Sequence, residues 1–302
     1  MNKPLSQKKI HVSIGIPIYK GQKHIAETIR SVLSQDWHNF DVLMSVDNND
    51  TESAKICRTF LSDSRFKLHI HRTRLGWVNN FSYLMKHQTG DYWCYLAQDD
   101  LITPSYIRKL VAWAETHPEA AVVYSDIQCF GTNKMRFYQQ SVVGKPVDRE
   151  IDLIRNHLPA VAFRGVVRRN VLLKSGGIRN NNLDSFCCDT TWMATCARFG
   201  ELHRIPQALY RKRYHSNNTH STWTKHSPSW LEYAWAVHCR DMFKEAIPVT
   251  DTIWEKYSIF NATRYRLLHS PTSWAFIRTP NRSRLQRVLY LVRLIWLLIR
   301  SD

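Results

Sequence analysis

Residues 92–100 read YWCYLAQDD, an apolar run that ends directly in two carboxylates. Aromatic residues at this density are typical of a buried strand, and Asp99 and Asp100 follow at its carboxyl end. Pro104 favours the start of a helix, which the pattern extends to about residue 116. A buried strand that leads through polar residues into a helix is the repeating unit of an α/β fold.

The same alternation of strand and helix fills the chain before residue 92. Apolar runs rich in β-branched residues predict strands, and apolar residues spaced three and four apart predict helices. The predicted strands are 10–17, 41–46 and 66–71, and the predicted helices are 23–35, 52–61 and 77–87. Repeated units of this kind predict a mostly parallel, Rossmann-like sheet with helices on both faces.

Beyond residue 116 the pattern is less regular. A strand is predicted over 121–126, and the polar stretch 130–150 is expected to be a mobile excursion. The remaining predicted elements are helices near 167–175 and 189–199, strands over 201–205 and 207–214, and helices from 228 onward.

The composition limits the classes of protein that the chain can belong to. Its 302 residues, 44% of them hydrophobic, suffice for one large packed domain with an appendage, which excludes general disorder. A formal charge of +17 is typical of chains that bind nucleic acid, an anionic membrane or a phosphorylated ligand. Seven cysteines without a CxxC pair, and a first apolar run that reads as a strand rather than a signal peptide, predict a reduced, cytoplasmic protein.

Two acidic clusters follow predicted strands, where a parallel sheet binds its ligands. Asp99 and Asp100 have no basic neighbour, which suits a hard divalent cation such as Mg²⁺ or Mn²⁺; one of them can instead cap the helix after Pro104. Asp47 and Asn48 can receive ribose hydroxyls or a base edge, or can form an Asx-turn or a helix cap.

Two further segments carry groups suited to chemistry. Asp189 stands at the start of a predicted helix, either as a proton acceptor or as an ordinary acid favoured by the helix dipole. Residues 210–215 read YRKRYH, a cationic run that either grips a diphosphate or forms a solvated strand edge.

Six motifs in this order resemble glycosyltransferase family 2, whose GT-A fold binds nucleotide-sugars. The resemblance covers about residues 9–220. The motifs are VSIGIPIYKG (12–21), IAETIRSVLSQDW (25–37), MSVDNNDTES (44–53), LGWVNNFSYLMKHQTGDYWCYLAQDD (75–100), FRGVVRRNVLLKSGGIR (163–179) and DTTWMATCARFGELHRIPQALYRKRYH (189–215). The resemblance implies a GT-A catalytic domain over 1–225 and a helical C-terminal extension over 226–302.

The resemblance also implies roles for individual residues. Asp47 and Asn48 would contact the base and ribose of a nucleotide-diphosphate sugar, in a pocket that Pro17 and Tyr19 also line. Asp189 would be the general base of an inverting transfer to a hydroxyl of a saccharide or polyprenyl-linked acceptor. We expect the pathway to be the synthesis of a bacterial cell-surface polysaccharide or lipopolysaccharide.

The resemblance also implies which residues bind the metal ion and the diphosphate. Asp99, with Asp100 beside it in the metal motif, would ligate Mg²⁺ or Mn²⁺. His215, together with Arg211 or Arg213, would close on the diphosphate or the metal.

Departures from the family pattern keep other readings open. The metal motif often begins with Asp where this chain has Ala97, and the catalytic base is often preceded by Glu where this chain has Cys188. A GT-A-like nucleotide-binding protein with lost or different activity is therefore an alternative, as is a basic, non-catalytic binding protein. Nucleic acid is not expected as a partner, because the basic residues are spread along the chain rather than clustered with aromatic residues.

The end of the chain, RSRLQRVLYLVRLIWLLIR at residues 282–300, combines arginines with a short apolar run. The uninterrupted apolar part is too short to span a bilayer. A basic amphipathic helix of this composition can lie at the surface of an anionic membrane, which here would be the inner face of the plasma membrane. The alternative is a helix packed on the catalytic domain or on a second copy of the chain.

Overall fold

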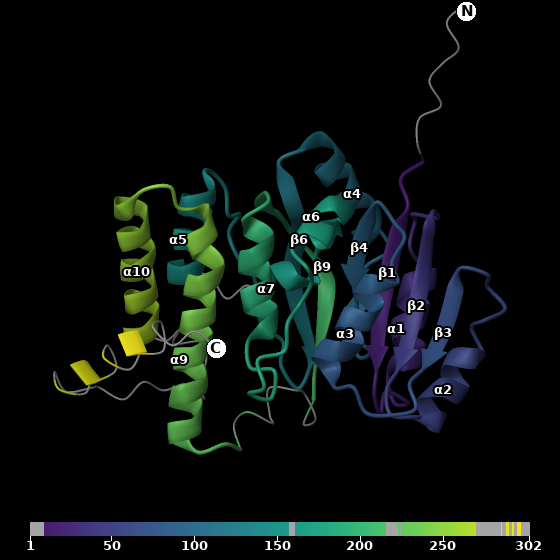
Figure 1. Cartoon of the computed structure of the whole chain (residues 1–302). Coiled ribbons are helices and arrows are strands. Elements are labelled where there is room, and N and C mark those ends of the chain that lie inside the picture. Colours follow the sequence, from purple (N-terminus) through teal and green to yellow (C-terminus); the bar gives the residue numbers. More distant parts are fainter. Residues whose placement is uncertain are drawn as a thin grey trace, which may run out of the picture.

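The structure is a computed structural model that describes residues 9–156, 161–215 and 225–269, together with the isolated positions 223, 285, 288, 289, 292, 295 and 296. Its described part is a single curved sheet covered by helices, with the first strands at one end and two long C-terminal helices at the other (Figure 1). Of the predicted basic helix at 282–300, positions 285, 288, 289, 292, 295 and 296 are described and helical, and the others lie outside the described residues.

The first ninety-odd residues form the alternating units that the sequence predicts. The elements are β1 (Val12–Ile18), α1 (Ile25–Leu33), β2 (Phe40–Val46), α2 (Thr51–Arg58), β3 (Phe66–Ile70), α3 (Trp77–Lys86) and β4 (Tyr92–Tyr95). Asp50 caps α2, because its side chain accepts a hydrogen bond from the backbone N–H of Ser53.

The second half of the chain adds shorter strands between helices. These elements are β5 (Leu101–Ile102), α4 (Tyr106–Thr116), β6 (Ala120–Gly131), β7 (Arg136–Phe137), α5 (Pro146–Asn156), the 3₁₀ helix η1 (Ala162–Arg164), β8 (Val166–Arg168), α6 (Arg169–Lys174), α7 (Cys188–Ala197) and β9 (Glu201–Tyr214). They are followed by α9 (Pro228–Ala246), the 3₁₀ helix η2 (Ile247–Val249) and α10 (Ile253–Leu268).

The strands pair in the order β3-β2-β1-β4-β8-β6-β9-β5, with β7 on β6. Strands β1, β2, β3 and β4 are parallel neighbours, and β6 and β9 run in the same direction as they do. Strands β5, β7 and β8 run the opposite way. The predicted mostly parallel sheet is confirmed, and the carboxyl ends of β1, β2, β4, β6 and β9 therefore lie at one edge.

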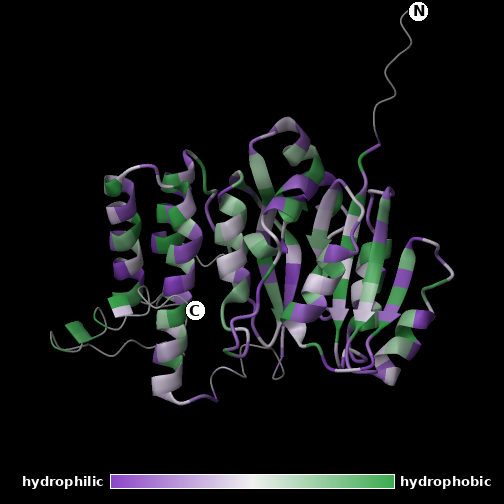
Figure 2. Ribbon diagram, in the orientation of Figure 1, coloured by the Kyte–Doolittle hydropathy of each residue, from purple (hydrophilic) through white to green (hydrophobic). Residues whose placement is uncertain are grey.

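Burial explains why these segments are strands and helices. Residues Val12 to Ile16 of β1 are all buried, as expected for a central strand covered on both faces. Figure 2 shows hydrophobic residues along the strands, whereas the helices mix hydrophobic and hydrophilic positions. The loops at the lower end of the molecule, where β1 and β2 end, are mainly hydrophilic (Figure 2).

The C-terminal helices α9 and α10 lie beside α5 at the end of the molecule away from β3 (Figure 1). They contribute Met242, Ala246, Ile259 and Ala262 to the same apolar core as the sheet. The domain boundary between 225 and 226 stays a prediction. Among the described residues, no helix combines the length and hydrophobicity needed to cross a bilayer.

The structure corrects the expectation for residues 130–150. This stretch is not one irregular excursion, because β6 continues to Gly131, β7 pairs with β6, and α5 begins at Pro146. The two strands predicted over 201–205 and 207–214 are one strand, β9, whose pairing with β6 has a register shift near Pro206. Gln139, Arg149 and Glu150 are buried although they are polar, which local sequence patterns cannot show.

Gly131 ends β6 against the last residue of β9, next to the site described below. Its φ is +87°, and a Cβ there would collide with the carbonyl oxygen of Tyr214. Gly144 also has a left-handed φ of +100°, but a Cβ there would meet nothing closer than Asp148 at 4.0 Å.

We therefore expect Gly131→Ala to destabilise the fold more than Gly144→Ala. The left-handed backbone costs about 1–2 kcal/mol for any L-residue, and crowding adds about 1–3 kcal/mol at Gly131 alone. Urea unfolding of both variants measures the difference. Equal losses would show that Tyr214 does not hold β6 and β9 together at this end.

Candidate active site

A pocket of about 420 Å³ opens at the edge where the parallel strands end. Its lining residues are Tyr19, Lys20, Gly21, Lys23, His24, Gln98, Asp99 and His215. They come from the loop after β1, the loop after β4 and the end of β9. The sheet thus brings three of the predicted site residues, Tyr19, Asp99 and His215, into one cavity.

Gln98 joins the ends of β1 and β4. Its Oε1 accepts a hydrogen bond from the backbone N–H of Tyr19 at 2.8 Å, and its Nε2 donates to the carbonyl oxygen of Tyr19 at 2.9 Å. From helix α1, the hydroxyl of Thr28 contacts the carbonyl oxygens of both Gln98 and Asp100. These hydrogen bonds fix the positions of Tyr19 and of the acidic pair, Asp99 and Asp100, relative to each other.

Asp99 faces the pocket beside His215. The carboxylate Oδ2 of Asp99 lies 2.8 Å from Nε2 of His215. Arg213 donates from Nε to the carbonyl oxygen of Asp99 and pairs through Nη2 with Glu27 of α1. His24 lies across the ring of His215, 5.4 Å between centroids, and burial followed by the charge of Arg213 lowers the pKa of His24.

Asp100 differs from Asp99 because its carboxylate is buried. The hydroxyl of Tyr210 donates to Oδ2, and the backbone N–H of Arg213 donates to Oδ1, each at 2.8 Å. Burial, then the charge of Asp99, raises the pKa of Asp100 to about 6. Asp100 does not line the pocket, so its predicted role as a metal ligand stays a prediction.

Two cations lie beside the acidic pair: Arg164, which was not predicted as a site residue, and Lys212, which belongs to the cationic run 210–215. Arg164, in η1, is nearly buried, and its Nε lies 3.7 Å from Oδ2 of Asp100. Lys212 has its pKa lowered to about 8 by burial and then by Arg164. Asp100 and Asp189 both raise the pKa of Lys212, which places these four charges in one electrostatic cluster.

Asp189 lies in the first turn of α7 and belongs to this cluster. Burial raises its pKa, while the positive charge of Arg164 acts in the opposite direction. Its Oδ1 accepts a hydrogen bond from the backbone N–H of Thr190 at 2.9 Å. A carboxylate with a raised pKa close to the acidic pair has the properties of a proton acceptor.

Asp47 has a structural role that the sequence left open. Its buried carboxylate accepts hydrogen bonds from the backbone N–H groups of Leu75 and Gly76 at 2.7 and 3.0 Å. Arg74 pairs with it at 3.2 Å and stacks on the ring of Tyr19, 3.3 Å from the centroid. Asp47 therefore holds the loop before α3 against the pocket wall.

The other predicted nucleotide contacts lie outside the pocket lining. Asn48 is exposed in a left-handed turn with φ of +56°, and Pro17 lies within β1 opposite Ser45. Arg211 is exposed, with its guanidinium 4.8 Å from the centre of the Phe130 ring. The roles assigned to these residues stay predictions.

Sequence reasoning missed Gln98, His24 and Arg164, and it placed Lys212 only within the cationic run 210–215. The period-two alternation of a strand places Lys212 on the face opposite Arg211 and Arg213, and this signal was available. Arg164 and Asp100 are 64 residues apart in the sequence, from position 100 to position 164. No local pattern could therefore identify the contact between them.

The pocket has a donor set that fits a hard or borderline divalent ion. One carboxylate, from Asp99, and one imidazole, from His215, face a cavity with room for further oxygen ligands. Mg²⁺ and Mn²⁺ commonly bind in this way, through one or two protein groups together with substrate phosphates.

Two relatives that are similar in sequence to this chain are both named as glycosyltransferases. An uncharacterized glycosyltransferase of Haemophilus influenzae is 21% identical over 70% of this chain and 68% of its own length. The putative glycosyltransferase EpsE of Bacillus subtilis is 29% identical over 55% of each chain, so this chain matches about half of that relative.

Solved structures share the fold at low sequence identity. S. aureus TarS (residues 1–349), in complex with UDP-GlcNAc, superposes with a TM-score of 0.70 at 14% identity, covering 96% of this chain and 82% of its own. The mannosyltransferase PcManGT of Pyrobaculum calidifontis, in complex with GDP-Man and Mn²⁺, gives a TM-score of 0.59 at 16% identity, covering 98% and 77%. The GT-A-like fold expected from the sequence is confirmed.

A family model described as glycosyl transferase family 2 matches residues 13–179. The matched range contains Tyr19, Asp47, Asp99 and Asp100, whereas Asp189 and His215 lie beyond it. With more than half of the 302 residues matched, this chain belongs to glycosyl transferase family 2 and is a glycosyltransferase.

Proposed function

We propose that the chain transfers a sugar, with inversion, from a nucleotide-diphosphate sugar to a hydroxyl group of a saccharide or polyprenyl-linked acceptor. The observation that carries this proposal is the pocket in which Tyr19, Asp99 and His215 meet, with Asp189 in the adjoining charge cluster. Such a site has separate groups for a leaving diphosphate and for an attacking hydroxyl.

The relatives support a nucleotide-sugar donor but differ in the nucleotide. The TarS structure is a complex with UDP-GlcNAc, and the PcManGT structure is a complex with GDP-Man and Mn²⁺. In this chain, the aromatic ring of Tyr19, stacked by Arg74, offers a flat surface for a base. The pocket side chains Lys20, Lys23 and His215 offer positive or hydrogen-bonding groups to the diphosphate.

The departing diphosphate must gain negative charge as the sugar–phosphate bond breaks. Asp99 and His215 would hold Mg²⁺ or Mn²⁺, which neutralises such charge when it is bound. Arg213 is fixed by Glu27 and by the Asp99 carbonyl, so it stays at the pocket edge without reorganising. Preorganised cations of this kind stabilise charge that develops in the transition state.

Asp189 is the group proposed to take the proton of the acceptor hydroxyl. A hydroxyl is a weak nucleophile until a base removes its proton, and a positioned base contributes about 10²–10⁴-fold in rate. One base that acts opposite the leaving group implies a single in-line displacement, in which the anomeric configuration inverts. By resemblance, the product belongs to a bacterial cell-surface polysaccharide or lipopolysaccharide.

Replacing Asp189 with Asn tests this role. Because Asn cannot accept the proton, we expect transfer to fall by about 10²-fold or more, while the affinity for the nucleoside diphosphate stays within about twofold. Asp148 also lies in the first turn of a helix, α5, but is exposed on that helix. Asp148→Asn is therefore the matched control and should leave transfer unchanged.

The pH dependence of transfer gives a second readout of Asp189. Its pKa is raised by burial, and only its deprotonated form accepts a proton, so kcat/KM should fall as the pH drops through that pKa. The acidic limb should lie above about 3.9, the value of an unperturbed Asp. An Asp189→Asn variant that retains both rate and acidic limb would instead favour a GT-A-like protein with different chemistry, the alternative that Ala97 raises.

The acceptor is proposed to be reached at the inner face of the plasma membrane. The described apolar side chains near the C-terminus recur at helical spacing and are all exposed: Leu285, Val288, Leu289, Val292, Ile295 and Trp296. Arginines at 282, 284, 287, 293 and 300 surround them in the sequence. This combination suits the surface of an anionic bilayer, where each basic residue adds about 1 kcal/mol of attraction.

Deletion of residues 282–302 tests the membrane contact. In sedimentation with vesicles containing an anionic lipid, we expect the full chain in the pellet and the shortened chain in the supernatant. Vesicles of zwitterionic lipid are the control and should retain less of the full chain. Equal sedimentation of the two chains would reject a membrane role for this segment.

A further inference from the structure

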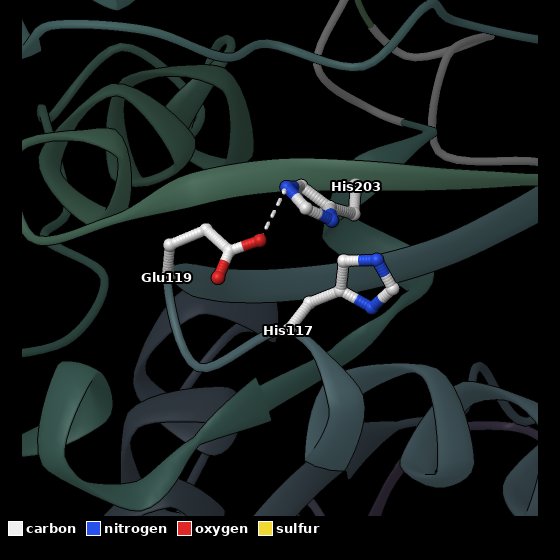
Figure 3. Close-up of side chains that lie close together, drawn as sticks. All are labelled: His117, Glu119 and His203. Atoms are coloured by element: carbon white, nitrogen blue, oxygen red, sulfur yellow. Dashed lines mark ion pairs between the residues drawn. The ribbon is translucent and has the colours of Figure 1, made fainter.

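A second group of potential metal ligands lies at the opposite edge of the sheet from the pocket. His117 follows α4, Glu119 precedes β6, and His203 lies near the start of β9. One ligand atom from each of the three lies within 4.8 Å of the others. Figure 3 shows the two imidazole rings and the carboxylate of Glu119 around a common space.

The buried imidazole of His203 has a defined protonation state. The indole Nε1–H of Trp113 donates to Nδ1 of His203 at 3.0 Å. Since an indole can only donate, Nδ1 is the unprotonated nitrogen of the neutral ring, and Nε2 carries the hydrogen. Nε2 lies 2.7 Å from Oε2 of Glu201, to which it donates.

His117 is oriented in a comparable way. Its Nδ1 lies 2.9 Å from the carbonyl oxygen of Trp113 and donates to it, which leaves Nε2 with its lone pair. Each imidazole thus has one nitrogen held by an oxygen acceptor, a carbonyl for His117 and a carboxylate for His203. This is how proteins orient the histidines that ligate a metal.

We propose that His117, Glu119 and His203 bind a divalent transition-metal ion of the zinc type. Two imidazoles and one carboxylate suit Zn²⁺, whereas Mg²⁺ prefers oxygen ligands alone. The ion would bind Nε2 of His117 and Nδ1 of His203, and a water molecule would complete the shell. Such an ion ties the turn between α4 and β6 to β9, far from the pocket at Asp99.

Two adjustments accompany metal binding at this site. Ligand atoms around a four-coordinate zinc lie about 3.3 Å apart, as follows from bonds of about 2.0–2.1 Å, so His117 and Glu119 must move inward. Glu119 is exposed and His117 is partly exposed, and both lie on a surface turn. Trp113 must withdraw its N–H from Nδ1 of His203, and its side chain, 37% exposed, has solvent to move into.

The metal alone is a sufficient probe. Co²⁺ in place of Zn²⁺ gives visible absorption bands whose intensity reports tetrahedral coordination, and equilibrium dialysis gives the number of ions bound. We expect one tetrahedral site in the full chain, lost in His117→Ala. His87 is exposed, and its Nδ1, like that of His117, contacts the backbone carbonyl four residues earlier, so it is the matched control. His87→Ala and Asp99→Asn should both keep the site.

An increase in the affinity for Zn²⁺ would distinguish a metal-binding site from a network of ion pairs that binds no metal. Trp113→Phe removes the donor that competes for Nδ1 of His203, so we expect Zn²⁺ to bind about three- to tenfold more tightly, corresponding to one net hydrogen bond. Absence of a tetrahedral Co²⁺ spectrum, or a spectrum that survives His117→Ala in a folded protein, would overturn the proposal.

Discussion

The pairing of the two-residue strand β5 with the end of β9 sets the geometry of the active site. β5 begins directly after Asp100, and its Leu101 and Ile102 pair with Arg211 and Tyr210. The acidic pair after β4 is therefore held against Tyr210, Arg213 and His215, which lie more than one hundred residues later in the chain. The long parallel pairing of β6 with β9 carries β9 to this edge of the sheet.

Three aspartates in this region lie in different electrostatic environments. Asp99 faces the open pocket, Asp100 is buried beneath Tyr210 and Arg213, and Asp189 lies beyond Arg164 and Lys212. Burial raises the pKa of both Asp100 and Asp189, and the positive charge of Arg164 acts to lower it and so offsets part of the cost of burying these carboxylates. Part of the excess of basic residues in the chain thus lies beside these three carboxylates and offsets their charge.

Local sequence patterns predicted the alternating first half because β1 to β4 are buried strands with strong apolar runs. They also placed Tyr19, Asp99 and His215 at strand ends, where the structure finds them in one pocket. They failed for α5, whose buried face contacts α10 and α7 rather than following a regular unit. They could not identify the contact of Arg164 with Asp100, because it depends on the antiparallel insertion of β8.

The central claim is that the pocket at Asp99 and His215 binds a nucleotide diphosphate together with a divalent ion. Calorimetric titration of the full chain with UDP, GDP and dTDP, each with Mn²⁺, Mg²⁺ or EDTA, tests it most directly. The account predicts tight binding of one nucleoside diphosphate that requires the metal and is lost in Asp99→Asn. Binding of none of the three, or binding indifferent to both EDTA and Asp99→Asn, would contradict it.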